Sequence, residues 1–376
     1  MSRRILLNGS FAPSITNFRG HLIQDMQAAG HTVHISVPDV SAEQRRKIEA
    51  IGAVLHEVPL DRAGINPLRD WAYYRRLRAL IRRVRPHLVI GYTIKPVIWG
   101  SFAAGAEGVA SASMITGLGY TFVQRRTLMQ RLLGFASRWL YRRATAGNRV
   151  VVFQNQDDRA DFIAAGCLAD EAKAKLVNGS GVDVQHFAPR PLPTAPVFLM
   201  IARLLVSKGV REYAAAAQQI RAQWPDCRFL LVGNLDETPD RIGSEELQAW
   251  QEAGIECWGW TDDVREPISQ ASIFVLPSYR EGTPRTVLEA AAMGRPVITT
   301  DAPGCRETVR DGETGLLVPA RDVAALVTAM ERLASDHSLR AEMGRRARDY
   351  VIGKFAIEQV NRTLMNHLGL LTEGTG

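Results

Sequence analysis

Two cationic side chains stand where a predicted strand ends and a helix begins. Arg203 follows the apolar run 197–202, and Lys208 with Gly209 directly precedes the helical stretch 210–223. In doubly wound α/β folds, ligands bind beyond the carboxyl ends of the strands. A guanidinium can grip two phosphate oxygens at once and an ammonium adds a point charge, so this pair suits a diphosphate.

A second segment at a strand end forms a tight turn that opens a helix. It runs from Pro277 to Pro284 and contains Gly282 and Thr283. Glycine permits the turn, and proline presets the start of the helix. Because helix N-termini bind anions, we expect the amides of the first turn to face one; these belong to Thr286, Val287 and Leu288.

Two glutamates flank this helix start. Glu281 lies in the turn, and Glu289 lies two turns into the helix, before the small residues Ala290–Ala292. A carboxylate at that position can accept both hydroxyls of a ribose, as the acidic residue does in dinucleotide-binding folds. Together with Arg203 and Lys208, the glutamates predict a nucleotide-diphosphate site.

The elements that must position these residues alternate between strand and helix in both halves of the 376-residue chain. A chain of this length predicts about two domains. Continuous apolar runs suit parallel strands buried on both faces. The predicted strands are Arg4–Asn8, Val33–Val37, Val54–Val58, Leu88–Gly91, Val150–Phe153, Val197–Ala202, Arg228–Val232, Ile273–Pro277 and Pro296–Thr299, and the predicted helices include Ala42–Ile51, Val210–Gln223 and Arg285–Met293. This pattern predicts an α/β protein with two Rossmann-like, doubly wound domains facing a central cleft.

The domain boundary is predicted at a proline-rich segment. Residues 189–196 contain four prolines, which favours a stiff linker over an element interior. We therefore expect an N-terminal domain over 1–188 and a C-terminal domain over 197–350. A final helix within 351–376 is expected to return towards the N-terminal domain.

Positive charge is concentrated in the N-terminal half. Residues 65–143 hold 14 Lys and Arg against two acidic residues, whereas the whole chain carries a net charge of +7. Such a patch implies an acidic partner. Nucleic acid is disfavoured, because no RNP, helix-turn-helix or zinc-finger signature accompanies the charge.

Aromatic and basic residues alternate along the predicted helices of this patch. One interpretation is an ordinary crossover helix with solvated arginines; the other, which we favour, is a platform for an anionic membrane surface. Its candidate contacts are Arg131, Phe135, Arg138, Trp139, Arg142 and Arg143.

Several classes of protein are disfavoured by composition. No apolar run approaches the roughly 18–20 residues that span a bilayer. The N-terminal apolar stretch is too short for a signal peptide, so we expect a cytoplasmic protein, peripheral on the inner face of the membrane. The four cysteines lack zinc-ligand spacing. No metal and no cofactor is expected, because Arg203 and Lys208 already supply cations and no DxD-like pair ends a strand.

The motifs together resemble the retaining glycosyltransferases of family 4, which have the GT-B fold. Glu281 and Glu289 match the E-x7-E signature, Arg203 and Lys208 match R-x4-K-G, and residues 179–187 match GxGVD…F. The resemblance implies that Arg203 and Lys208 hold the donor diphosphate, that Glu289 holds the ribose, and that Glu281 contacts the transferred sugar.

Within the family, the chain is most similar to bacterial enzymes that extend undecaprenyl-diphosphate-linked sugars. Tyr92–Pro96, Thr116–Gly119 and Phe153–Asn155 carry this likeness. It implies a UDP-linked N-acetylhexosamine donor such as UDP-GalNAc, a polyprenyl-diphosphate-linked acceptor near Lys95, and Gly9 across the cleft against the phosphates. The stretch Ile115–Gly119 lacks the histidine that many members place near the donor sugar.

Three functions fit this pattern. The first is a retaining, metal-independent transferase in which the leaving phosphate takes the acceptor proton, as the resemblance implies. The second is a UDP-sugar 2-epimerase of the same architecture, which would need no acceptor and no basic first domain. The third is a non-catalytic nucleotide-sugar-binding protein, which the presence of both glutamates disfavours.

Overall fold

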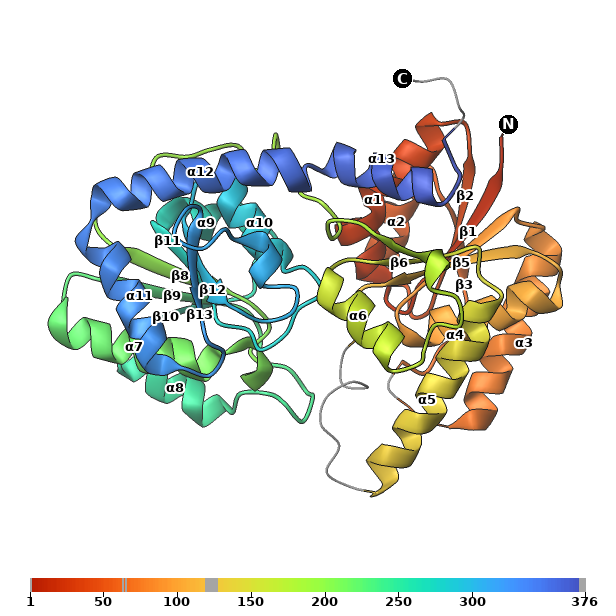
Figure 1. Ribbon diagram of the computed structural model, residues 1–376, viewed down its shortest axis with the longest axis horizontal. Coiled ribbons are helices and arrows are strands. Elements are labelled where there is room, and N and C mark those ends of the chain that lie inside the picture. Colours follow the sequence, from red (N-terminus) through yellow and green to blue (C-terminus); the bar gives the residue numbers. More distant parts are fainter. Residues whose placement is uncertain (1, 63, 65, 119–127, 372–376) are drawn as a thin grey trace. The chain divides into compact units, whose positions relative to one another are not determined.

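The computed structural model describes residues 2–371 apart from residues 63, 65 and 119–127. The chain forms two compact units (Figure 1). The first comprises Met1–Ser180 and Val360–Gly376, and the second comprises Gly181–Gln359. The proline-rich segment 189–196 lies within the second unit.

The first unit contains a parallel sheet in the order β3-β2-β1-β4-β5-β6-β7. Its elements are β1 (Arg4–Asn8), α1 (Ala12–Ala28), β2 (Thr32–Val37), α2 (Ala42–Ala50), β3 (Val54–Glu57), α3 (Pro67–Val84), β4 (Leu88–Tyr92), α4 (Ile94–Ala106), β5 (Ala110–Ile115), α5 (Leu128–Ala146), β6 (Val150–Phe153), α6 (Gln156–Ala164) and β7 (Ala174–Leu176).

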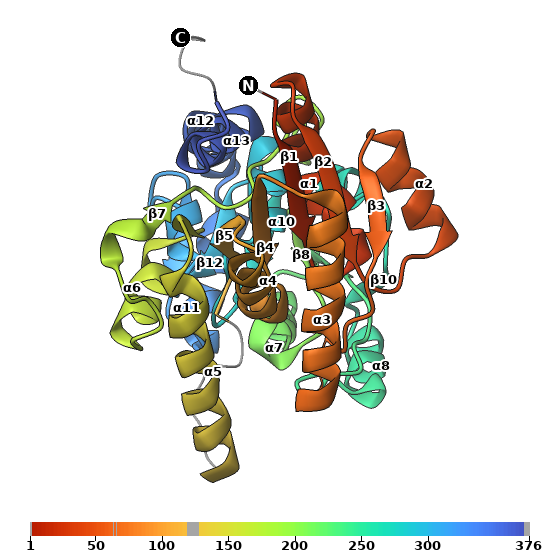
Figure 2. The same ribbon diagram turned by 90° about the vertical axis from the view of Figure 1, so that its right-hand side faces the viewer.

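Side chains alternate between the two faces along each strand. Apolar residues therefore point to both faces of this sheet, and helices cover both. Ile5 and Leu7 of β1 pack in one cluster with α1, whereas Leu6 packs in another with α3. Helix α4 lies between α3 and α5 on the second face (Figure 2). Leu364 and Met365 of α13 (Ile357–His367) complete the first cluster.

The second unit contains a parallel sheet in the order β10-β9-β8-β11-β12-β13. Its elements are β8 (Val197–Ile201), α7 (Val210–Gln223), β9 (Arg228–Val232), α8 (Ser244–Glu252), β10 (Glu256–Gly259), α9 (Arg265–Gln270), β11 (Ile273–Leu276), α10 (Arg285–Ala292), β12 (Val297–Thr300), β13 (Gly315–Val318), α11 (Val323–Ser335) and α12 (His337–Phe355).

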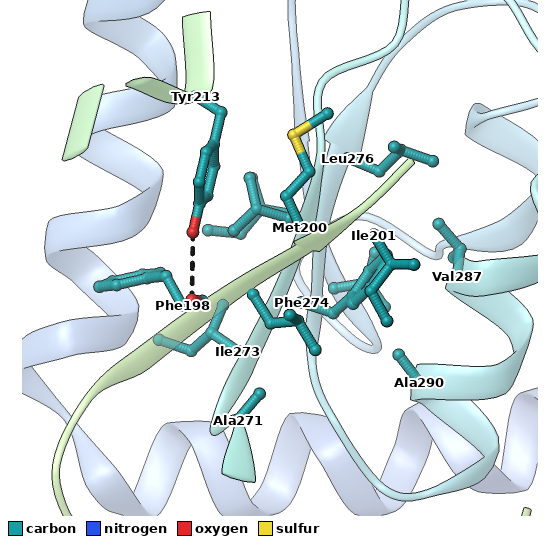
Figure 3. Close-up of a cluster of buried hydrophobic side chains, with 14 of the residues drawn as sticks. Phe198, Met200, Ile201, Tyr213, Ala271, Ile273, Phe274, Leu276, Val287 and Ala290 are labelled. Atoms are coloured by element: carbon teal, nitrogen blue, oxygen red, sulfur yellow. Dashed lines mark hydrogen bonds between the residues drawn. The ribbon is translucent and has the colours of Figure 1, made fainter. Parts of the chain in front are cut away.

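One apolar core supports the second sheet (Figure 3). Phe198 of β8 and Phe274 of β11 are fully buried, and Val287 of α10 packs in the same cluster. Tyr213 of α7 donates its hydroxyl to the carbonyl oxygen of Phe198 at 3.1 Å. The predicted α/β class with two doubly wound parallel sheets is confirmed.

Candidate functional site

The topological switch point of the second sheet lies between β8 and β11. The chain adds β9 and β10 on one side of β8, and β11, β12 and β13 on the other. Because β8 and β11 are parallel neighbours, the loop after β8 and the turn after β11 leave the same edge of the sheet. This is where open α/β sheets bind ligands.

Lys208 and Glu281 meet at this edge. The Lys208 Nζ lies 2.5 Å from Glu281 Oε1, and the two side chains are only 20% and 13% exposed. The Ser278 hydroxyl donates to the same oxygen at 2.8 Å. The Tyr279 amide donates to the Ser207 carbonyl at 2.9 Å and so ties the turn to the loop. The structure therefore brings together two of the residues that the sequence singled out.

Gly209 lets the loop pack against the turn. Its φ is +73°, and a Cβ there would lie 2.1 Å from the Pro277 carbonyl oxygen. A side chain would clash with backbone in a conformation that already strains L-residues. Glycine is thus required where the loop after β8 packs against the turn after β11.

Replacing Gly209 by alanine is expected to lower the free energy of unfolding by about 1–3 kcal/mol, the usual cost of a strained backbone position. Denaturant unfolding measures this difference. Gly20→Ala is the matched control: it lies inside α1 with nothing within 4 Å of an added Cβ, so it should stabilise the protein slightly. A Gly209→Ala protein as stable as the parent would contradict the packing described.

Arg203 occupies an exposed position in the loop that also holds Lys208. Its side chain is 65% exposed, and its Nη1 lies 3.0 Å from Asp236 Oδ2. The amide of Thr238 and the Arg203 guanidinium both hold the pKa of Asp236 below its usual range. Asp236 was not predicted from the sequence, although it lies shortly after β9, the strand next to β8, where a ligand-binding residue is expected.

Glu289 is buried in α10. It is 6% exposed, and its Oε1 lies 2.8 Å from Arg285 Nε, one turn earlier. Burial raises the pKa of Glu289 to about 7, and the positive charge of Arg285 opposes this rise. Near neutral pH its carboxyl group is therefore partly protonated and partly ionised.

Three residues at the start of α10 make hydrogen bonds within the second unit. The amides of Val287 and Leu288 donate to the Pro284 carbonyl at 3.2 and 3.4 Å, so both already have a partner at the helix start, and the anion contact expected of them stays a prediction. The Thr286 hydroxyl donates to the Ile201 carbonyl at 3.2 Å and holds α10 against β8. The Thr283 hydroxyl donates to the Gly282 carbonyl at 2.9 Å.

A further loop supports the turn and was also missed. The Glu281 amide donates to the Pro303 carbonyl at 2.9 Å. Gly304 has φ +76°, and a Cβ there would lie 2.2 Å from the Glu281 carbonyl oxygen. The loop follows β12, the neighbour of β11, so a Pro-Gly pair after a predicted strand could have revealed it.

The remaining expected contacts belong to the first unit. The Gly9 amide donates to the Ser36 carbonyl at 2.9 Å, and a Cβ on Gly9 would lie 2.4 Å from the Tyr92 hydroxyl. Lys95 is mostly buried, with its Nζ 2.6 Å from Asp70 Oδ1. Gly119, the last residue of the stretch without histidine, lies outside the described residues.

Helix α5 presents apolar and basic side chains together. Leu132, Phe135 and Trp139 are 58%, 67% and 50% exposed. Arg131, Arg142 and Arg143 are exposed and Arg138 is half-buried; the Arg143 guanidinium lies 5.4 Å from the centre of the Trp139 ring. We call these seven residues the α5 surface. No described helix is long and apolar enough to span a membrane.

Two sequence families together match most of the chain. A family described as "Glycosyl transferase 4-like domain" matches residues 15–179. One described as "Glycosyl transferases group 1" matches residues 195–336, which include Arg203, Lys208 and both glutamates. The chain belongs to the group 1 glycosyltransferases.

Individual relatives agree with this assignment. The chain is 26% identical over 349 residues to a Campylobacter jejuni N,N'-diacetylbacillosaminyl-diphospho-undecaprenol alpha-1,3-N-acetylgalactosaminyltransferase, covering 89% of this chain and 90% of that protein. It is 25% identical to an Escherichia coli UDP-Gal:alpha-D-GlcNAc-diphosphoundecaprenol alpha-1,3-galactosyltransferase, covering 80% and 79%.

Solved structures with a similar fold can be superposed on nearly the whole chain. The structure of Anabaena Alr3699/HepE in complex with UDP-glucose has a TM-score of 0.77, with 15% identity and coverage of 98% and 100% of the two chains. The two parallel α/β units thus have the GT-B fold, and the enzyme is a glycosyltransferase.

Proposed function

We propose that this glycosyltransferase moves an N-acetylhexosamine, such as GalNAc, from a UDP-sugar onto a polyprenyl-diphosphate-linked saccharide with retention. The observation that supports the donor part of this proposal is the Lys208–Glu281 ion pair at the switch point of the second sheet. Arg203 lies in the same loop as Lys208, and Glu289 lies in the helix that follows the turn of Glu281.

Each member of this cluster has a distinct task. The leaving diphosphate gains negative charge as the bond to the anomeric carbon breaks, and Arg203 and Lys208 stabilise that charge where it develops. Glu281 accepts hydrogen bonds from the sugar, and Glu289 accepts the ribose hydroxyls. The leaving phosphate oxygen takes the proton of the acceptor hydroxyl as the new glycosidic bond forms. The contact of Gly9 with the phosphates, which the family resemblance implies, stays a prediction.

Two observations support the acceptor part of this proposal. The Campylobacter and Escherichia coli relatives are named for diphospho-undecaprenol acceptors. Independently, the α5 surface joins large exposed apolar side chains to four arginines. Aromatic and arginine side chains suit the headgroup level of an anionic leaflet, where a lipid-linked acceptor resides. We therefore propose that the enzyme binds an anionic membrane peripherally through this surface.

Lys95 is left out of this surface. Its ammonium group is mostly buried and pairs with Asp70. If Lys95 turned towards a lipid, the Asp70 carboxylate, which is only 15% exposed, would lose its cation. An unpaired buried charge is costly.

A panel of UDP- and GDP-sugars tests the proposal. Each is incubated with the purified protein, with and without vesicles carrying lipid-linked saccharides. We expect a UDP-N-acetylhexosamine to add one sugar to the lipid fraction. Conversion of a free UDP-sugar to its 2-epimer without lipid would instead identify an isomerase, and binding of a UDP-sugar without any turnover would indicate a binding protein.

A further inference from the structure

The ion pair inside α10 has an order that does not favour the helix. Arg285 is the first residue of the helix and Glu289 follows one turn later. A cation at the helix N-terminus opposes the helix dipole, and acid-before-base is the stabilising order for such pairs. Helix stability alone therefore gives a weak reason for this pair.

The surroundings of Glu289 offer it no other cation among the described residues. Strands β11 and β12, which pack against α10, contain no charged residue. On α12, Arg348 donates to the Ala292 carbonyl, and Arg295, after α10, donates to backbone carbonyls including that of Ile268. Lys208 pairs with Glu281. Arg285 alone contributes charge to the ionisation of Glu289.

We propose that Arg285 is a positioning residue that favours the ionised form of the Glu289 carboxylate, the form that accepts both ribose hydroxyls of the donor. This rests on the proposed function of Glu289. Glu289 is 6% exposed, so an uncompensated charge there would be costly. Without Arg285, burial would raise the pKa of Glu289 further above the value of about 7 that it has beside the guanidinium. A protonated carboxyl would then face the ribose at neutral pH.

Thermal unfolding tests this charge coupling without any ligand. Because the folded pKa of Glu289 is raised, its contribution to stability is complete below its unfolded pKa and is lost as pH rises through the folded value. At pH 5 the carboxyl is mostly protonated, so Arg285→Ala should change the melting temperature little. At pH 8 the same variant should lose about 3 °C or more.

Three further variants isolate the effect. Adding Arg285→Ala to Glu289→Gln should not introduce a pH-dependent loss, and Arg285→Lys should restore most of the pH 8 stability. Arg211→Ala is the matched control, because Arg211 pairs with Glu246 on the exposed surface of the same unit; it should change little at either pH. An equal loss at pH 5 and pH 8, or one that persists beside Glu289→Gln, would overturn the proposal.

Donor binding gives the functional test. Titration with UDP-GalNAc should show affinity about 3- to 10-fold weaker for Arg285→Ala at pH 7, with the difference shrinking as pH rises. The kcat should change less than KM, because a ribose contact is the same in ground and transition states. If Glu289→Ala binds the donor like the parent, the proposed ribose contact fails. If Glu289→Ala loses binding but Arg285→Ala matches the parent at every pH, the Arg285 proposal alone fails.

Discussion

Replacing Lys208 by alanine is expected to lower kcat about 10- to 100-fold and to raise the donor KM much less. A charge-assisted hydrogen bond contributes roughly 1.5–3 kcal/mol, and each 1.36 kcal/mol is tenfold in rate. The effect falls on kcat because the diphosphate charge with which Lys208 interacts grows in the transition state. Steady-state kinetics over donor concentration measures both constants.

The partner of Lys208 requires its own control. Lys208→Ala leaves the Glu281 carboxylate, 13% exposed, without its cation, so part of any loss could come from that orphaned charge. Lys208→Ala combined with Glu281→Gln removes it. Because both residues are assigned to the donor, the double variant should be no more active than the single one. Recovery in the double variant, or a pure KM effect in the single one, would contradict a role for Lys208 in the transition state.

Changing Arg131, Arg138, Arg142 and Arg143 to glutamine should release the enzyme from vesicles that contain anionic lipid. Each basic residue near such a surface contributes about 1 kcal/mol, so loss of four should weaken binding at least 100-fold. Salt should weaken binding of the parent in the same direction, since the Debye length is only about 8 Å at 0.15 M. Vesicle sedimentation gives the bound fraction, and activity on the lipid-linked acceptor should fall with it.

A control variant with the same net charge shows whether the α5 surface or the overall charge determines vesicle binding. The control variant changes four arginines of the second unit to glutamine and so removes the same number of charges. They are Arg228, Arg265, Arg345 and Arg346, whose side chains are 42–62% exposed. This variant should leave vesicle binding nearly intact. Activity of the α5 variant on a short, water-soluble acceptor should change little. If both variants bound vesicles like the parent, the α5 arginines would be a solvated helix face.

The fold was largely predictable because both sheets are buried and parallel. Continuous β-branched runs such as Val150–Phe153 predict such strands directly. Strand β5 was not predicted, because its sequence ASASMI has little strand propensity and its extended form depends on pairing with β4 and β6. Strand β10, with only four residues at the sheet edge, was missed for a similar reason.

The sequence predicted those site residues that lie close together in the chain, within one turn and the helix after it. It did not predict contacts between residues of different loops. The turn holding Glu281 and the helix holding Glu289 follow from one continuous segment. The pairing of Arg203 with Asp236, and of Glu281 with Pro303, depends on which strands are neighbours. The burial of Glu289 beside Arg285 depends on packing of α10 against α12, which spacing alone does not reveal.

Acceptor-dependent transfer of a labelled sugar tests the central claim most directly. Purified protein is incubated with UDP-GalNAc labelled in the sugar, with and without vesicles of undecaprenyl-diphosphate-linked saccharide, and both the lipid fraction and released UDP are counted. We predict that label enters the lipid fraction in equal amount to the UDP released, and that both stop when the acceptor is omitted. Two results would contradict the proposed transfer. One is turnover of UDP-GalNAc at the same rate without acceptor, and the other is a lipid fraction that receives no label from any UDP-sugar.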